Sequence, residues 1–456
     1  MHNTSIARYL LAACAAMSIL APARADQDSR YLDRKFDDGY DGRGFYDQAG
    51  RKQQDEGIQL GPRPFYLLEG MDEGKLKHRL LRCQNGPFYR TDFSIAHRGA
   101  ALQFPEHTKE SYTAGALQGA GIVECDVTFT KDGDLVCRHA QNDLHTTTDI
   151  LVTPLAGKCI KPFTPATFDA SGNRLTPASA ECRASELTLD EFKSLRGKMD
   201  ASNPSARTAE EFLGGTAPWR TDVYTGRGTL MTLRESIALN QKLGVKHTPE
   251  LKGGEAVSIQ AVFGSQEKYA QKLADELREA GVEPRDAWPQ SFNVNDVLYW
   301  IENTGYGDQA VFLIDYDASS DKILLFDRDG RQIEGRREQL AFLTKLRKAK
   351  VRIVAPAMPA LLTVDVNGRI VPSQLAKDLK ALGFDIITWT FERSDLRRGA
   401  SKAGFYYDFD AQGRAVQKDS DMYKALDVLA REVRILGIFS DWPATVTYYA
   451  NCMGLK

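Results

Sequence analysis

The segment 94–148 constrains the fold of this chain most strongly, because polar side chains recur where its predicted strands end. The pattern predicts, in order, a strand over 94–96, a helix over 108–117, a strand over 122–130 and an Asp-Gly turn at 132–133. Glu124 and Asp126 are two residues apart in a strand, so alternation places both carboxylates on one face. His97 follows the first strand and His139 follows the turn. The segment therefore gathers two histidines and two carboxylates at one end of a sheet.

Apolar strands and helices alternate through the rest of the chain. Further strands are expected over 245–252, 288–292, 310–314, 352–356, 385–390 and 435–441. Helices are expected over 188–195, 232–243, 268–280, 295–302, 337–348, 373–382 and 421–432, the first opening with the capping box Thr188–Glu191. Near-continuous apolar strands between helices indicate a parallel sheet covered on both faces.

Counted from residue 94, the strands make eight β/α units, and no Gly-x-Gly-x-x-Gly follows any of them. We therefore predict an α/β protein with a closed (β/α)8 TIM barrel rather than an open doubly wound sheet. The barrel is expected over 94–456, with a loop insertion at about 149–185 that is rich in Pro, Thr and Ala. A second loop-like excursion is expected over 208–219.

The N-terminus reads as a secretory signal peptide over residues 1–25. Arg8 supplies the positive charge, 9–20 is mainly apolar, and Ala23-Arg24-Ala25 is a cleavage pattern of small residues. A lipoprotein reading, with cleavage before Cys14, leaves too short an apolar run after Arg8. No later run approaches the ~20 apolar residues of a membrane helix. We expect an exported protein, periplasmic or secreted, with no transmembrane segment.

Residues 26–93 precede the barrel as an N-terminal arm and strap. The arm, 26–57, is polar and lacks a sustained apolar period. The strap follows it, with helical spacing of apolar residues over 71–83, and is expected to close one end of the barrel.

Six cysteines remain after the predicted cleavage, and an even count in an exported chain suggests disulfides. The best pairing is Cys159 with Cys182 around the insertion. Fifteen connectivities are possible for six cysteines, and the other candidate pairs are Cys125 with Cys137 across the hairpin and Cys83 with Cys452 near the chain ends. A zinc site is disfavoured because no Cys-x-x-Cys occurs.

Several motifs together resemble the glycerophosphodiester phosphodiesterase family in order and spacing. They are His97-Arg98-Gly99, Pro105-Glu106-x-Thr108, Glu124-x-Asp126-Val127, Thr130-x-Asp132-Gly133, His139, Pro249-Glu250-x-Lys252, Trp389-Thr390 and Ser440-Asp441-x-Pro443. The resemblance covers 94–443 and implies a TIM barrel that hydrolyses glycerophosphodiesters to glycerol 3-phosphate and an alcohol. It leaves the arm and the strap unexplained.

The resemblance also implies roles for individual residues. Catalytic residues are expected at His97 and His139, metal ligands at Glu124, Asp126 and Glu250, phosphate-binding residues at Arg98 and Lys252, and a supporting role at Glu106. Three carboxylates in one barrel mouth repel each other unless a cation joins them, and oxygen ligands suit one Ca²⁺ or Mg²⁺. The alternative is that one carboxylate merely pairs with Arg98 or Lys252. Two imidazoles can divide general acid and general base work.

The sequence departs from the family's pattern at the residue after His139. Ala140 stands where the family commonly has Asp, and Asp143 is a candidate substitute. His107 and His145 stand where the family more often has Asn and Arg and are of lower rank as site residues. His247 is out of phase with Glu250, which favours a packing role, and Trp389 is a candidate wall for the glycerol carbons.

The net charge of −2 gives no electrostatic reason to expect nucleic acid or an anionic membrane as partner. The expected partner is a small glycerophosphodiester. An alternative is a phospholipase D-like enzyme acting on lysophospholipids or sphingolipids, and a non-catalytic barrel is a further one. The attacking group is either water or the glycerol 2-hydroxyl. The preferred head group and the oligomeric state do not follow from the sequence.

Overall fold

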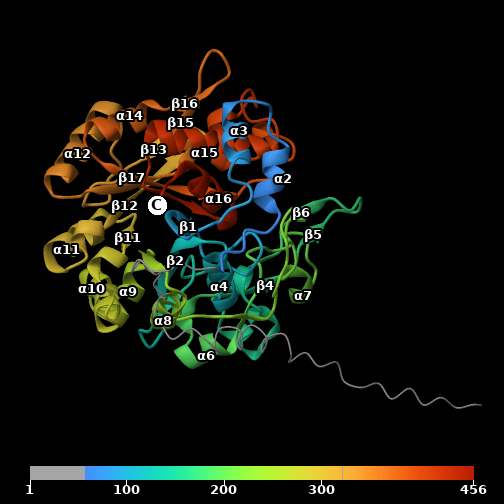
Figure 1. The fold of residues 1–456 in the computed structure, drawn as a ribbon. Coiled ribbons are helices and arrows are strands. Elements are labelled where there is room, and N and C mark those ends of the chain that lie inside the picture. The colour runs from blue at the N-terminus through green and yellow to red at the C-terminus, as the bar shows by residue number, and fades with distance from the viewer. Residues whose placement is uncertain (1–56, 321) are drawn as a thin grey trace, which may run out of the picture. The chain divides into compact units, whose positions relative to one another are not determined.

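The computed structural model describes residues 57–320 and 322–456. The predicted signal peptide and all but the last residue of the predicted arm lie outside the described residues. The described part is built around eight parallel strands that close into a barrel, because β1 pairs with both β2 and β18 (Figure 1). In barrel order they are β1 (Thr91–Ala96), β2 (Ala120–Phe129), β10 (Lys246–Leu251), β11 (Gln290–Ser291), β12 (Val311–Asp317), β14 (Ile353–Pro356), β17 (Asp385–Phe391) and β18 (Gly437–Ser440). The predicted (β/α)8 barrel and its eight strands are confirmed.

Helices between the strands surround the barrel. The main ones are α4 (Lys109–Leu117), α6 (Leu189–Ser194), α8 (Leu233–Leu243), α9 (Ala256–Phe263), α10 (Gln266–Glu279), α11 (Val294–Asn303), α12 (Arg336–Lys348), α14 (Gln374–Ala381), α15 (Met422–Val428) and α16 (Pro443–Met453). The predicted helix over 421–432 is two elements, α15 and a π-helical turn over Leu429–Val433. Helix α9 was missed, because its apolar residues do not keep to one face and no strong cap precedes them.

Local sequence chemistry sets several helix ends as predicted. Thr188 forms a capping box with Glu191 at the start of α6, and Thr232 forms a second one with Glu235 at the start of α8. Helix α8 ends at Gly244, whose φ of 66° belongs to the left-handed region that glycine adopts without strain.

The interior of the barrel is filled by apolar side chains from alternate strand positions. They are Ile95, Ile122, Val311, Leu313, Ile353, Ala355, Ile387 and Phe439, all nearly inaccessible to solvent. This packed layer fills the centre of the barrel, so the barrel is a core and not a channel. Polar side chains beyond the layer, at the carboxyl ends of the strands, therefore form the bottom of a cavity.

Short elements lie beside the barrel. They are β3 (Leu135–Cys137), α5 (Leu144–Thr147), β8 (Arg196–Gly197), β9 (Gly228–Thr229), β13 (Lys322–Leu324), α13 (Met358–Leu361), β15 (Leu362–Val364) and β16 (Ile370–Pro372). Strand β3 returns antiparallel to β2, as the Asp-Gly turn predicted.

The insertion at 149–185 has more structure than its composition suggested. Strand β4 (Lys161–Thr164) pairs with β7 (Ser179–Glu181), and β5 (Thr167–Phe168) pairs with β6 (Arg174–Thr176). These strands are too short for a periodic signal. The segment packs on an apolar cluster that includes Phe192 and Phe212, the latter from helix α7 (Ala209–Phe212) in the predicted second excursion.

The strap contains helices α2 (Arg63–Glu69) and α3 (Lys75–Leu81), and both contact α16. The hydroxyl of Tyr448 in α16 donates to the backbone oxygen of Leu80 at 2.7 Å. In Figure 1 these two helices, in blue, lie beside α16. Since α16 in turn packs on β1, the strap forms an outer layer over α16, whereas the sequence reading placed it across an end of the barrel.

All three predicted disulfides are confirmed. They are Cys83–Cys452, Cys125–Cys137 and Cys159–Cys182. Within 57–320 and 322–456, no helix combines the length and the apolar character needed to cross a lipid bilayer.

Candidate active site

A cavity of about 670 Å³ opens at the carboxyl ends of the barrel strands. Seven of the eight predicted site residues line it: His97, Arg98, Glu106, Glu124, His139, Glu250 and Lys252. The eighth, Asp126, is 1% exposed and contacts the others from below the cavity wall. Residues spread over more than 150 positions of sequence are therefore brought to one place by the barrel.

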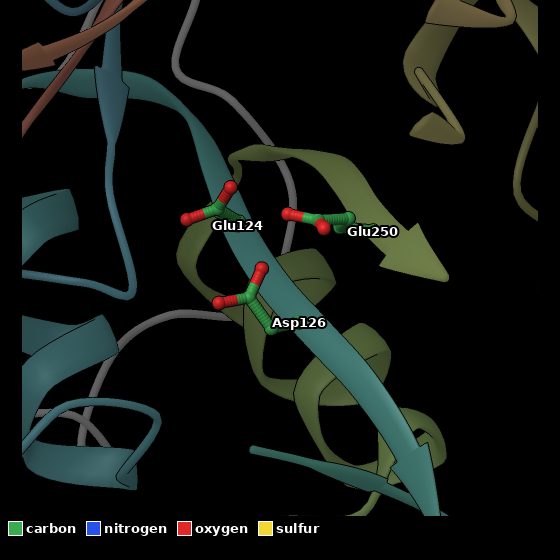
Figure 2. Close-up of side chains that lie close together, drawn as sticks. All are labelled: Glu124, Asp126 and Glu250. Atoms are coloured by element: carbon green, nitrogen blue, oxygen red, sulfur yellow. The ribbon is translucent and has the colours of Figure 1, made fainter. Parts of the chain in front are cut away.

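The three predicted metal ligands face one another. Parallel pairing of β2 with β10 sets Glu250 beside Asp126, and Glu124 lies two residues earlier on the same face of β2. One oxygen from each carboxylate lies within 4.8 Å of the others. Figure 2 shows the three carboxylates grouped close together beside β2 and β10. The arrangement follows from strand alternation and register alone.

The carboxylate cluster is unfavourably charged without a cation. Burial, with repulsion from Asp126, raises the pKa of Glu124 well above its usual value and that of Glu250 to about 7. Burial opposes ionisation of Asp126 too, but Lys252 and His107 hold its pKa well below its usual value. Asp126 Oδ1 is buried, and no hydrogen-bond partner for it lies within 57–320 and 322–456. A buried set of carboxylate oxygens with an unsatisfied acceptor fits a hard divalent cation.

Two cationic side chains also contact the carboxylate cluster. Lys252 Nζ lies 2.6 Å from Glu250 Oε1, and Arg98 Nε lies 3.3 Å from Asp126 Oδ2. The sequence left open that a carboxylate pairs with Arg98 or Lys252 and does not bind a metal. Both ion pairs are present, and they are compatible with the carboxylate cluster because each paired carboxylate keeps a second oxygen.

His97 is held in a defined orientation by a residue that the sequence reading assigned no role. Its Nδ1 lies 2.5 Å from Asp441 Oδ1, directly after β18, and Asp441 Oδ2 accepts from Arg393 Nη1 at 2.8 Å. A carboxylate at Nδ1 assigns the proton to that nitrogen and leaves the lone pair on Nε2. Nε2 lies 3.7 Å from Glu124 Oε2. Burial, then Arg98, lowers the pKa of His97 to about 4, against the opposing effect of Asp441, so the ring is neutral at pH 7.

Glu106 fixes the guanidinium of Arg98. Its Oε2 accepts from Arg98 Nη1 at 2.8 Å, and its backbone oxygen accepts from Arg138 Nη2 at 2.5 Å. Burial disfavours the charge, but Arg98 and then Arg393 lower the pKa of Glu106 to about 2. The Arg98 backbone N–H donates to Glu124 Oε2 at 3.0 Å, and Arg98 has the unusual φ of 56° that this approach requires.

His139 lines the cavity, and burial, with Arg98 and Lys252, holds its pKa well below the usual value. No hydrogen bond to its ring is recorded within 57–320 and 322–456. Asp143, the candidate substitute for the missing Asp, accepts from the Ala140 backbone N–H at 3.0 Å. It therefore supports the backbone beside His139 and not the imidazole.

The three lower-ranked histidines separate in the structure. His107 is fully buried, and its Nε2 lies 2.9 Å from Asp126 Oδ2, so it contacts the carboxylate cluster directly. His145 stacks on Phe212 in the insertion cluster. His247 is buried beside Asn240, as a packing role predicts.

Sequence reasoning missed four polar residues of this site. Gln290 Nε2 donates to Glu124 Oε1 at 2.9 Å, and Gln290 Oε1 is buried without a partner. Arg393 bridges Asp441 to Asp200, whose Oδ2 it reaches at 2.9 Å. Arg393 follows a predicted strand and Asp441 ends one, whereas Gln290 lies inside the predicted strand 288–292; the position at a strand end was a signal for Arg393 and Asp441 only.

Comparison with known proteins agrees with this geometry. The sequence profile of the glycerophosphoryl diester phosphodiesterase family matches residues 97–445. An "Extracellular protein" of Arthroderma benhamiae is 39% identical over 260 residues, which cover 56% of this chain and 100% of that protein. Glycerophosphodiester phosphodiesterase GDPD6 of Arabidopsis thaliana is 22% identical over 78% of this chain and 85% of its own.

Among solved structures, a putative glycerophosphoryl diester phosphodiesterase of Silicibacter pomeroyi superposes with a TM-score of 0.49 at 18% identity, covering 81% of this chain and 96% of its own. A phosphodiesterase of Oleispira antarctica, solved with sn-glycerol-3-phosphate, gives a TM-score of 0.44 at 17% identity, with coverages of 78% and 95%. The profile match, which spans most of the chain, shows that the protein belongs to the glycerophosphoryl diester phosphodiesterase family and is a phosphoric diester hydrolase.

Proposed function

We propose that this protein is an exported, metal-dependent phosphodiesterase that hydrolyses glycerophosphodiesters to glycerol 3-phosphate and an alcohol. The observation that carries the proposal is the clustering of Glu124, Asp126 and Glu250, with one oxygen each within 4.8 Å, at a cavity that Glu124, Glu250 and two histidines line. The name of the Arabidopsis relative supports the choice of substrate class.

Glu124, Asp126 and Glu250 would hold one Ca²⁺ or Mg²⁺, since all their donor atoms are oxygens. When bound, such a cation neutralises the carboxylates and draws electron density from a non-bridging phosphate oxygen. Gln290 orients Glu124 through its amide, and His107 orients Asp126.

Arg98 and Lys252 supply positive charge at the phosphate side of the cavity. Both are already ion-paired, Arg98 with Glu106 and Lys252 with Glu250. Fixed in this way, they face the developing charge of the transition state without having to reorganise. Glu106 acts through Arg98 and is a positioning residue.

His97 and His139 divide the two proton transfers. His97 exchanges its proton at Nε2, because Nδ1 is bonded to Asp441. Burial lowers the pKa of each imidazole, which favours the neutral form that can take the proton of the attacking hydroxyl. The other imidazole acts as the general acid and must carry its second proton before it passes one to the departing alcohol. Trapping of a cyclic glycerol phosphate would identify the 2-hydroxyl as the attacking group, and its absence would identify water.

Three observations support export. The sequence of 1–25 has the pattern of a signal peptide, three disulfides close the fold, and one relative is described as extracellular. N-terminal sequencing of the protein recovered from the growth medium or periplasm tests this, with Asp26 expected as the first residue.

The activity is tested by release of glycerol 3-phosphate from glycerophosphodiesters, with lysophosphatidylcholine as the alternative substrate. We expect activity to be lost in EDTA, restored by Ca²⁺ or Mg²⁺, and abolished in Glu124→Gln. The exposed Glu283→Gln is the matched control and should behave as wild type. Full activity in EDTA, or turnover of the lysophospholipid alone, would overturn the proposal.

A further inference from the structure

The mouth of the barrel is divided into two unlike halves. Most of the charged residues come from or follow β1, β2 and β10, which are consecutive in the barrel; Arg393, which follows β17, is an exception and pairs with Asp200 and Asp441. The wall across from them includes β12 and β17, and it presents Asp315, Trp389 and, from the loop after β17, Tyr406 to the same cavity. A phosphodiester bound at the charged half must therefore extend one of its two arms toward this second wall.

Strand alternation aims Asp315 and Trp389 into the mouth. Val311 and Leu313 of β12 lie in the barrel interior, so Asp315, two residues further, lies on the same face at the open end. On β17, Ile387 lies in the barrel interior, so Trp389, two residues further, also lies on the interior face at the open end. The indole N–H of Trp389 donates to the Ala355 backbone oxygen at 2.9 Å, which fixes the ring and leaves no donor for a ligand.

The second wall is aromatic. Trp389 contacts Tyr406 edge-on, with ring centroids 6.4 Å apart, and stacks with Phe405 at 6.3 Å. Phe292 lies against Trp389 with centroids 5.9 Å apart, and its own ring already faces Lys252 Nζ at 5.9 Å. Trp389 and Tyr406 both line the cavity, and among residues 57–320 and 322–456 no cationic side chain lies over either ring.

Asp315 differs from the acidic residues on the charged side. There, Glu106 pairs with Arg98, Glu250 with Lys252, and Asp200 with Arg393. The Asp315 carboxylate accepts a hydrogen bond from the Tyr316 backbone N–H at 2.8 Å. Within 57–320 and 322–456, no cationic side chain pairs with it.

Aromatic faces and a carboxylate with no paired cation, lining one cavity, form the usual recognition site for an ammonium group, and for a quaternary one above all. Building on the proposed function, we propose that Asp315, Trp389 and Tyr406 form a head-group subsite that selects glycerophosphodiesters whose alcohol carries an ammonium group, as choline and ethanolamine do. A neutral polyol head group would leave the negative charge of Asp315 without a positive partner in the bound complex.

The test compares kcat/KM for glycerophosphocholine, glycerophosphoethanolamine and glycerophosphoglycerol. Wild type should prefer the two ammonium substrates over the neutral one. Asp315→Asn should lower kcat/KM for glycerophosphocholine by about tenfold and leave that for glycerophosphoglycerol within twofold. The matched control, Asp308→Asn at an exposed carboxylate, should change neither value.

A second measurement does not depend on any variant. Choline should inhibit the wild-type enzyme competitively, and its uncharged isostere 3,3-dimethylbutan-1-ol should inhibit at least several-fold less well. Equal inhibition by the two alcohols, or an equal loss for all substrates in Asp315→Asn, would overturn the subsite while leaving the proposed function standing. Failure of wild type to release glycerol 3-phosphate from any of the three diesters would instead overturn the proposed function.

Discussion

Removing one charge from the carboxylate cluster should stabilise the metal-free protein. Burial and the neighbouring Asp126 raise the pKa of Glu250 from 4.5 to about 7 in the folded state, although Lys252 opposes them. The unfolded chain therefore loses this proton at lower pH than the folded one, and folding is disfavoured as pH rises from 4.5 through 7. Two and a half pKa units correspond to about 3 kcal/mol. Glu250→Gln, which mimics the neutral form, should raise the free energy of unfolding by about that amount at pH 8.

Urea denaturation in EDTA at pH 5 and pH 8 measures this effect directly. We expect the stabilisation at pH 8 and much less of it at pH 5. Adding Ca²⁺ at one hundred times its dissociation constant should stabilise wild type by about 2.7 kcal/mol and Glu250→Gln far less, so the gap between the two should close. The exposed Glu283→Gln serves as the control. A Glu250→Gln protein that is less stable than wild type in EDTA at pH 8 would refute the reasoning, as would equal stabilisation of both by Ca²⁺.

Three further outcomes are expected. Asp441→Asn should lower kcat on the order of a thousandfold, because an amide no longer holds the His97 proton on Nδ1. The circular dichroism spectrum should not change. A loss of kcat below threefold would contradict the role of Asp441 in orienting His97. Replacing both Cys83 and Cys452 with Ser opens a loop of 369 residues and should cost about 5 kcal/mol in urea denaturation, whereas a cost below about 1 kcal/mol would show that the link constrains little. Burial lowers the pKa of His247 to about 4, so the unfolded state takes up this proton at higher pH than the folded state does. The free energy of unfolding should therefore fall by up to about 3 kcal/mol as pH drops from 6.5 to 4. His247→Gln should flatten that part of the plot of stability against pH, and an unchanged plot would exclude the effect.

The barrel could be predicted because its signals are local and repeated. Each strand is an apolar run of a few residues, and each helix between strands has an apolar face or a cap, as Thr188 and Thr232 show. Eight repeats of one pattern leave few architectures open. The insertion at 149–185 has no such repetition, so its strands of two to four residues were not seen.

The site could be predicted in part for the same reason. Glu124 and Asp126 share a strand, and alternation alone puts them on one face. The partner of His97 is 344 positions away, and a single Asp after a strand carries no spacing signal of its own. His107 has a low rank in the sequence because the family more often has Asn there, yet a loop with a φ of 57° at this residue places its ring beside Asp126.

The Cys125–Cys137 bond makes the catalytic apparatus sensitive to the compartment in which the chain folds. Cys125 lies between Glu124 and Asp126, and Cys137 lies two residues before His139, so one covalent link joins the acidic strand to the loop of the second imidazole. A chain synthesised in a reducing cytosol would have to align these groups without that tether. Recombinant enzyme should therefore be produced through an oxidising secretory route, where thiol oxidation and assembly of the reaction centre proceed together.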